Sequence, residues 1–72
     1  MKAAKQIAAD LRMLRGDRTQ EMVANALNIS PSAIAMYEAG ERIPRDEVKA
    51  AIAAYYGTSV GELFFGEESH IS

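Results

Sequence analysis

The chain has 72 residues, a length that suits one small domain with a single core. It has no cysteine, which excludes disulfides, thiolate metal sites and cysteine nucleophiles. Its formal net charge is −2, but residues 1–20 carry five basic and two acidic side chains, whereas residues 21–72 carry three basic and eight acidic ones. An acidic balance is less common in nucleic-acid-binding modules, although local patches rather than total charge decide contact with phosphate.

No apolar run approaches the length of a membrane span, and the N-terminal MKAAKQIAADL lacks the apolar centre of a secretory signal. We therefore expect a soluble, cytoplasmic protein with no membrane partner. The sequence has no glycine-rich phosphate loop, no metal-ligand spacing and no paired carboxylates, and its one histidine, His70, lies in a polar tail. We predict that the protein is not an enzyme and uses no metal or cofactor.

Hydrophobic periodicity predicts helices along the whole chain, because no stretch alternates apolar and polar residues as a half-buried strand does. The first helix is expected over residues 3–15. Its inner face should carry Ile7, Leu11 and Leu14, which are spaced by one helical turn. Gly16 is expected to end it.

Two short helices are predicted next, over residues 20–27 and 31–39. Thr19 and Ser30 are expected to cap their N-termini, since a hydroxyl oxygen can accept a hydrogen bond from a free backbone N–H. Asn28 should end the first of them, because asparagine tolerates a left-handed backbone. The second begins with proline and stops at a glycine, as helices commonly do. The side chains expected inside are Val23, Ala24, Leu27, Ile34 and Tyr37.

Two further helices are predicted over residues 46–56 and 60–65, and a capping box at Ser59 opens the second of them. The inner face of the longer helix is expected to carry Val48, Ala51, Ile52, Tyr55 and Tyr56. Residues 67–72 are polar and are expected to form a flexible tail. The predicted fold is therefore all-α, a compact five-helix bundle that forms one domain over residues 1–66.

The stretch QEMVANALNISPSAIAMYEAGERIP, residues 20–44, has two short helices around a tight turn and a small residue, Ala24, where the helices come closest. It resembles the helix-turn-helix of the XRE family, the Cro and phage-repressor type of DNA-binding domain. EAGERIP, residues 38–44, fits the family motif E-x-G-x-x-x-P, and GTSVGELF, residues 57–64, is similar to the family ending G-V-S-x-x-E-L-F. The resemblance covers residues 11–64 and implies a lambda-repressor-like helix-turn-helix domain that binds double-stranded DNA.

The same resemblance implies roles for individual residues. The helix over 31–39 would lie in the major groove, where its exposed residues approach base edges. These base-reading residues are Pro31, Ser32, Ala35 and Met36. They suit thymine methyl groups but offer no bidentate pair to guanine or adenine, so specificity would rest on methyl contacts, water or DNA shape. The residues expected to contact phosphates are Arg18, Gln20, Ser30, Arg42 and Arg45.

The loop over residues 16–19 looks one residue longer than in the family. If this insertion is accepted, Arg12 aligns with the arginine that pairs with the glutamate near the end of the recognition helix. An Arg12–Glu38 ion pair, with a structural role, is then expected. Without the insertion, Met13 takes that position and the pair is absent.

Operators read by this family are commonly two-fold, so we expect a homodimer. The apolar C-terminal end exceeds what so small a core absorbs, and a dimer interface is expected there. It would be formed by Val60, Leu63, Phe64 and Phe65. The alternative is that these side chains close the base of the domain itself.

The leading interpretation is a small, repressor-like transcriptional regulator that binds a short palindromic operator sequence-specifically. Its control would come from concentration, operator arrangement or a regulatory partner protein. A mobile element, a restriction–modification cassette or a toxin operon would suit such a regulator. The alternative is a protein-interaction module that retains the helix-turn-helix fold with weak or no DNA binding, which the acidic balance and the apolar recognition helix favour.

Overall fold

The computed structural model describes residues 1–67, and its regular structure in this range is helical. The helices are α1 (Ala4–Arg15), α2 (Gln20–Leu27), α3 (Pro31–Ala39), α4 (Asp46–Tyr55) and α5 (Val60–Phe65). The predicted all-α, five-helix fold is confirmed. The first helix begins one residue later than predicted, and the fourth ends one residue earlier.

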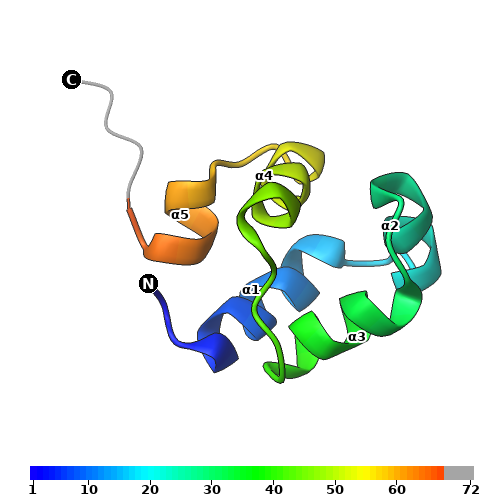
Figure 1. Ribbon diagram of the computed structural model, residues 1–72, viewed down its shortest axis with the longest axis horizontal. Helices are drawn as coiled ribbons and strands as arrows, with labels where there is room; N and C mark the ends of the chain where they lie inside the picture. The colour runs from blue at the N-terminus through cyan, green and yellow to red at the C-terminus, as the bar shows by residue number, and fades with distance from the viewer. Residues whose placement is uncertain (68–72) are drawn as a thin grey trace.

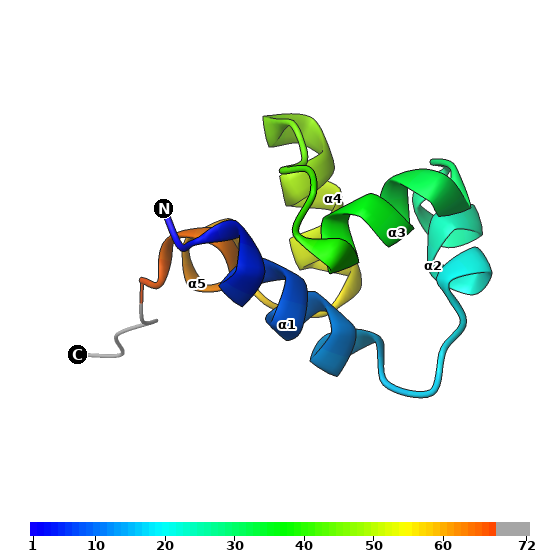
Figure 2. The same ribbon diagram turned by 90° about the horizontal axis from the view of Figure 1, so that it is seen from below.

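Figure 1 shows that α1 crosses the middle of the molecule, with α2 and α3 together at one end and α5 at the other. The helix α4 packs against both α2 and α5. Figure 2 shows α3 beside α2 and close to α1, followed by the segment that leads into α4. Over residues 1–67, no helix is long and apolar enough to cross a membrane. The predicted flexible tail, with His70 in it, lies outside the described residues except for Glu67.

Three hydroxyl side chains cap the N-termini of α2, α3 and α5. The Oγ1 atom of Thr19 accepts a hydrogen bond from the N–H of Met22 at 3.0 Å. The Oγ atoms of Ser30 and Ser59 accept in the same way from the N–H groups of Ala33 and Glu62, each at 3.1 Å. At the other end of α2, Asn28 has the left-handed conformation, with φ of 57°. The turn between α2 and α3 is therefore set by residues on both of its sides.

The core is one cluster to which all five helices contribute. Its buried members are Ile7, Leu11, Val23, Ala24, Ile34, Tyr37, Ile52, Ala53, Leu63 and Phe64. Burial of each large aliphatic or aromatic side chain stabilises the fold by about 1.5–3 kcal/mol. Leu14, Leu27 and Ile29 pack against the edge of the cluster.

The inner face of α4 differs from the prediction at Ala51, which is exposed. Ile52 is buried as predicted, and Lys49 and Ala53, which were not predicted on this face, are buried beside it. The sequence around Ala51 contains several alanines, and these side chains are too alike in size and hydrophobicity to indicate which of them faces inward. Lys49 was not predicted to be buried; its Nζ lies 5.8 Å and 5.1 Å from the ring centroids of Phe64 and Phe65.

Half of the predicted dimer interface belongs to the core. Leu63 and Phe64 are buried within this chain, so their side chains have no surface to offer a second copy. For these two residues the alternative interpretation is the correct one, because the small domain needs them to close its own base. Val60 is partly buried against the core, and Phe65 is 43% exposed.

Gly40 determines how closely α3 approaches α1. Its φ is +75°, a value that residues with a side chain rarely adopt. A Cβ atom at this position would also lie 3.4 Å from the carbonyl oxygen of Ala4. The end of α3 is therefore held directly against the start of α1.

Candidate nucleic-acid interface

The helix α3 buries one face and presents the other outwards. Ile34, Tyr37 and Glu38 are buried. The opposite side forms an outer stripe, because its residues recur at helical spacing around one direction. The outer stripe consists of Pro31, Ser32, Ala35, Met36 and Ala39; Ala35 and Met36 are partly buried and the other three are exposed.

A groove runs beside α3, between this helix and the segment that leads into α4. Ser30 and Ala33 line it on the α3 side, and Arg42 and Arg45 line it on the other. Both arginines are exposed, and the Nε of Arg45 lies 3.4 Å from a carboxylate oxygen of Glu47. The structure thus brings together three of the residues predicted to contact phosphate; that role stays a prediction.

The charge along the groove is mixed. Glu41, in the same segment as the two arginines, is exposed, and so are Asp46 and Glu47 in the first turn of α4. Attraction to phosphate is therefore local, acting at the arginine side chains rather than over the whole surface.

The side chain of Gln20 forms a hydrogen bond within the protein. Its amide Nε2 donates to the Oε1 of Glu38 at 3.0 Å. One of its two amide N–H groups is therefore engaged within the protein. What the start of α2 can offer is the backbone N–H groups of its first turn, where the helix dipole also favours negative charge.

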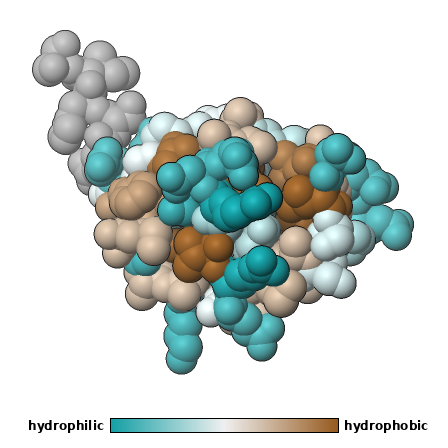
Figure 3. Space-filling view, viewed as in Figure 1, coloured by the Kyte–Doolittle hydropathy of each residue, from teal (hydrophilic) through white to brown (hydrophobic). Residues whose placement is uncertain are grey.

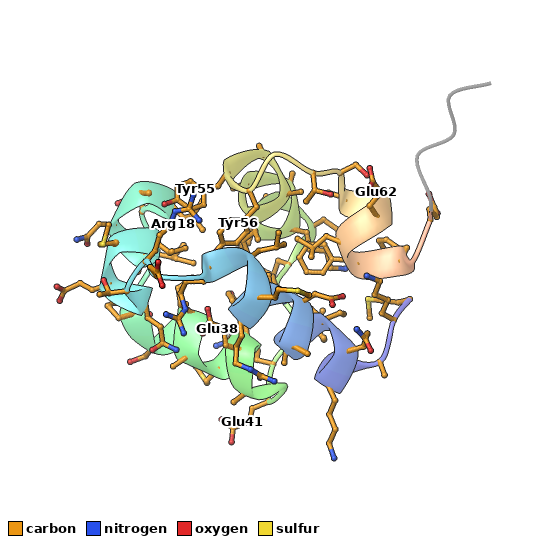
Figure 4. The ribbon with its side chains drawn as sticks, turned by 180° about the vertical axis from the view of Figure 1, so that it is seen from behind. Arg18, Glu38, Glu41, Tyr55, Tyr56 and Glu62 are labelled. Atoms are coloured by element: carbon orange, nitrogen blue, oxygen red, sulfur yellow. The ribbon has the colours of Figure 1, made fainter. Side chains whose placement is uncertain are left out.

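Arg18 is not part of the groove. Its guanidinium lies 5.4 Å and 5.7 Å from the ring centroids of Tyr55 and Tyr56, and its Nη1 donates to the carbonyl of Leu14 at 3.1 Å. Figure 4 shows Arg18 beside the two tyrosines, on the opposite side of the view from Glu41. Burial raises the pKa of Tyr56 above its ordinary value.

Glu38 pairs with Arg15, and the predicted Arg12–Glu38 ion pair is wrong. The Nε of Arg15 lies 3.1 Å and 2.8 Å from the two carboxylate oxygens of Glu38. Arg12 instead donates to the main-chain carbonyl of Glu38, in the last turn of α3. The two arginines are three residues apart, so both face α3, and the one nearer the end of α1 reaches the carboxylate. The hydrogen bond between Arg15 and Glu38 is the main cause of the raised pKa of Arg15.

The carboxylate of Glu38 joins three helices. It is 4% exposed and accepts from Arg15 of α1 and from Gln20 of α2. Among residues 1–67, every buried side-chain nitrogen or oxygen has a hydrogen-bond partner. Such a network fixes the orientation of α3 relative to α2, which decides how the outer stripe is presented.

Comparison with known proteins shows which family the chain belongs to. The helix-turn-helix family model matches residues 9–63. The chain is 36% identical over 62 residues to the cryptic phage CTXphi transcriptional repressor RstR of Vibrio cholerae. The alignment covers 86% of this chain and 55% of the relative, so the chain spans about half the length of that protein. No solved structure matches significantly. With the family match over most of its length, the chain belongs to the XRE-type helix-turn-helix family of DNA-binding proteins.

Proposed function

We propose that the protein is a small transcriptional repressor that binds double-stranded DNA with α3 in the major groove. The family is one of DNA-binding regulators and not of enzymes, and the Vibrio cholerae relative is named a transcriptional repressor. The observation that carries the proposal is the outward stripe of α3 beside a groove that holds Arg42 and Arg45. The major groove of B-DNA is wide enough for an α-helix presented in this way.

The proposed contacts divide into two kinds. Pro31, Ser32, Ala35 and Met36 approach base edges. Arg42, Arg45 and Ser30 contact phosphates, together with the backbone N–H groups at the start of α2, where Gln20 lies. For Arg18 we propose a structural role instead, because its guanidinium already packs over two tyrosine rings.

Few charged contacts per subunit imply modest affinity and favour a homodimer on a two-fold operator. If both arginines of each subunit neutralise a phosphate, log K falls against log[salt] with a slope of about −4 for the dimer. The proposed dimer interface is the exposed part of the C-terminal end, Phe65 with Val60. Figure 3 shows the most hydrophobic residues of one face in separate spots between polar ones. A regulatory partner protein and a cytoplasmic location stay predictions.

Fluorescence anisotropy with labelled duplexes across a salt series tests the proposal. A random duplex and one selected from a library are compared. Arg42→Ala is expected to weaken binding to all duplexes alike and to reduce the slope by about one for each lost phosphate contact. Arg18→Ala is the matched control and is expected to leave the slope unchanged. Absence of binding to any duplex at low salt would contradict the proposal.

A protein-interaction module is the second candidate. The acidic residues beside the arginines and the apolar outer stripe favour it, because both weaken attraction to DNA. In that case the selected duplex would bind no better than the random one, and both would bind only weakly at low salt.

A further inference from the structure

The outer stripe of α3 has almost no hydrogen-bonding capacity. Four of its five side chains are those of proline, alanine or methionine, and only Ser32 carries a hydroxyl. Reading a guanine or adenine edge with two hydrogen bonds requires an arginine, lysine, asparagine or glutamine side chain. Within α3 itself there is no such residue.

The neighbouring polar side chains are not part of the outer stripe. Gln20 directs one N–H of its side-chain amide to Glu38. The hydroxyl oxygen of Ser30 accepts from the backbone of α3 as its cap. Arg42 and Arg45 line the groove beside the helix rather than the outer stripe. Apart from the hydroxyl of Ser32, the side chains of the outer stripe therefore offer a base edge apolar contact alone.

The major groove has one apolar feature that distinguishes base pairs, the C5 methyl group of thymine. 5-Methylcytosine carries the same methyl group on the same ring carbon. An apolar side chain that contacts this methyl group gains the same burial from either base. Methionine is well suited to this contact, because its flexible thioether adapts to the surface that it meets.

We propose, resting on the proposed DNA-binding function, that α3 recognises C5-methylated pyrimidines through Met36 and Ala35 and treats thymine and 5-methylcytosine alike. The protein then responds to cytosine methylation in its operator. Burial of one methyl group corresponds to about a fourfold change in affinity. Several contacted methyl groups multiply this factor.

The experiment uses the duplex that the full chain selects from a random library, with binding measured by anisotropy. Each thymine of one half-site is replaced in turn by deoxyuridine, which removes the methyl group and keeps the pairing. Each contacted thymine is expected to show about a fourfold loss. At those positions a C·G pair is expected to weaken binding, and 5-methylcytosine in the same pair is expected to recover most of it.

The side chain responsible is tested with Met36→Ala, which is expected to reduce the deoxyuridine effect. Met13→Ala is the matched control, because Met13 is 74% exposed on α1, and it is expected to keep the full effect. Binding that survives while deoxyuridine changes affinity less than twofold at every position would overturn this inference alone and indicate reading by shape. Failure of every duplex to bind would overturn the proposed function as well.

Discussion

Replacing Arg15 by alanine is expected to destabilise the fold far more than replacing Arg12, one turn earlier in the same helix. The Arg15 side chain is 23% exposed, whereas the carboxylate it contacts is 4% exposed. Its removal leaves a buried charge with Gln20 as its remaining side-chain donor. Hydrogen bonds to charged groups contribute about 1.5–3 kcal/mol, and breaking a fully buried pair costs about 3–5 kcal/mol. Because Arg15 is partly solvated, we expect a loss of about 2–4 kcal/mol.

Arg12→Ala removes one hydrogen bond to a main-chain carbonyl, which corresponds to about 0.5–1.5 kcal/mol. A domain of this size has a free energy of unfolding of roughly 4–10 kcal/mol, so the two variants are easily distinguished. Urea unfolding followed by circular dichroism measures both. For Arg15→Ala the melting temperature is expected to fall by at least about 8 °C. A loss for Arg12→Ala equal to or larger than that for Arg15→Ala would refute the assignment of the ion pair to Arg15.

Three further predictions concern the fold and its assembly. Gly40→Ala is expected to lower the free energy of unfolding by about 2 kcal/mol, because a left-handed backbone and a close contact with α1 combine there. Gly57 has a similar φ, but a Cβ atom there would meet open space among the described residues, so Gly57→Ala is expected to cost about 1 kcal/mol. Equal losses of stability for the two variants would contradict the close contact at Gly40. Since burial raises the pKa of Tyr56, its stabilising contribution is present below about pH 10 and is lost as the pH rises through the folded-state pKa. The free energy of unfolding is measured as the pH is raised into the alkaline range. Tyr56→Phe, which removes the titrating group, is expected to lose less stability over this range than the control Tyr55→Phe. Identical pH profiles of the two variants would argue against this role of Tyr56. Phe65→Ser is expected to convert a dimer into a monomer in sedimentation experiments with unchanged helicity, and a wild-type chain that stays monomeric at high concentration would exclude the interface.

Helix ends could be predicted from the sequence because their causes are local. The hydroxyls of Thr19 and Ser30 can act only on the backbone that immediately follows them. Gly40 likewise ends α3 through its own backbone conformation. The turn between α2 and α3 could therefore be predicted from neighbouring residues alone.

Partners across helices could not be predicted in the same way. Arg12 and Arg15 both reach Glu38, and the packing angle between α1 and α3 decides which of them bonds its carboxylate and which its main-chain carbonyl. The burial of Lys49 has a similar origin, since its stem and ammonium group lie against two aromatic rings of a later helix. Leu63 could not be assigned to core or interface from its hydrophobicity, because both environments favour the same side chain.

The central claim, that α3 presents its outer stripe to DNA, is tested most directly by NMR. Backbone amide shifts of the labelled protein are followed while the selected duplex is added. The largest changes are expected at the non-proline residues of 30–36 and 42–45, with small changes near Arg18 and Tyr55. Changes confined to α5 and the end of α4, with none along α3, would contradict the account.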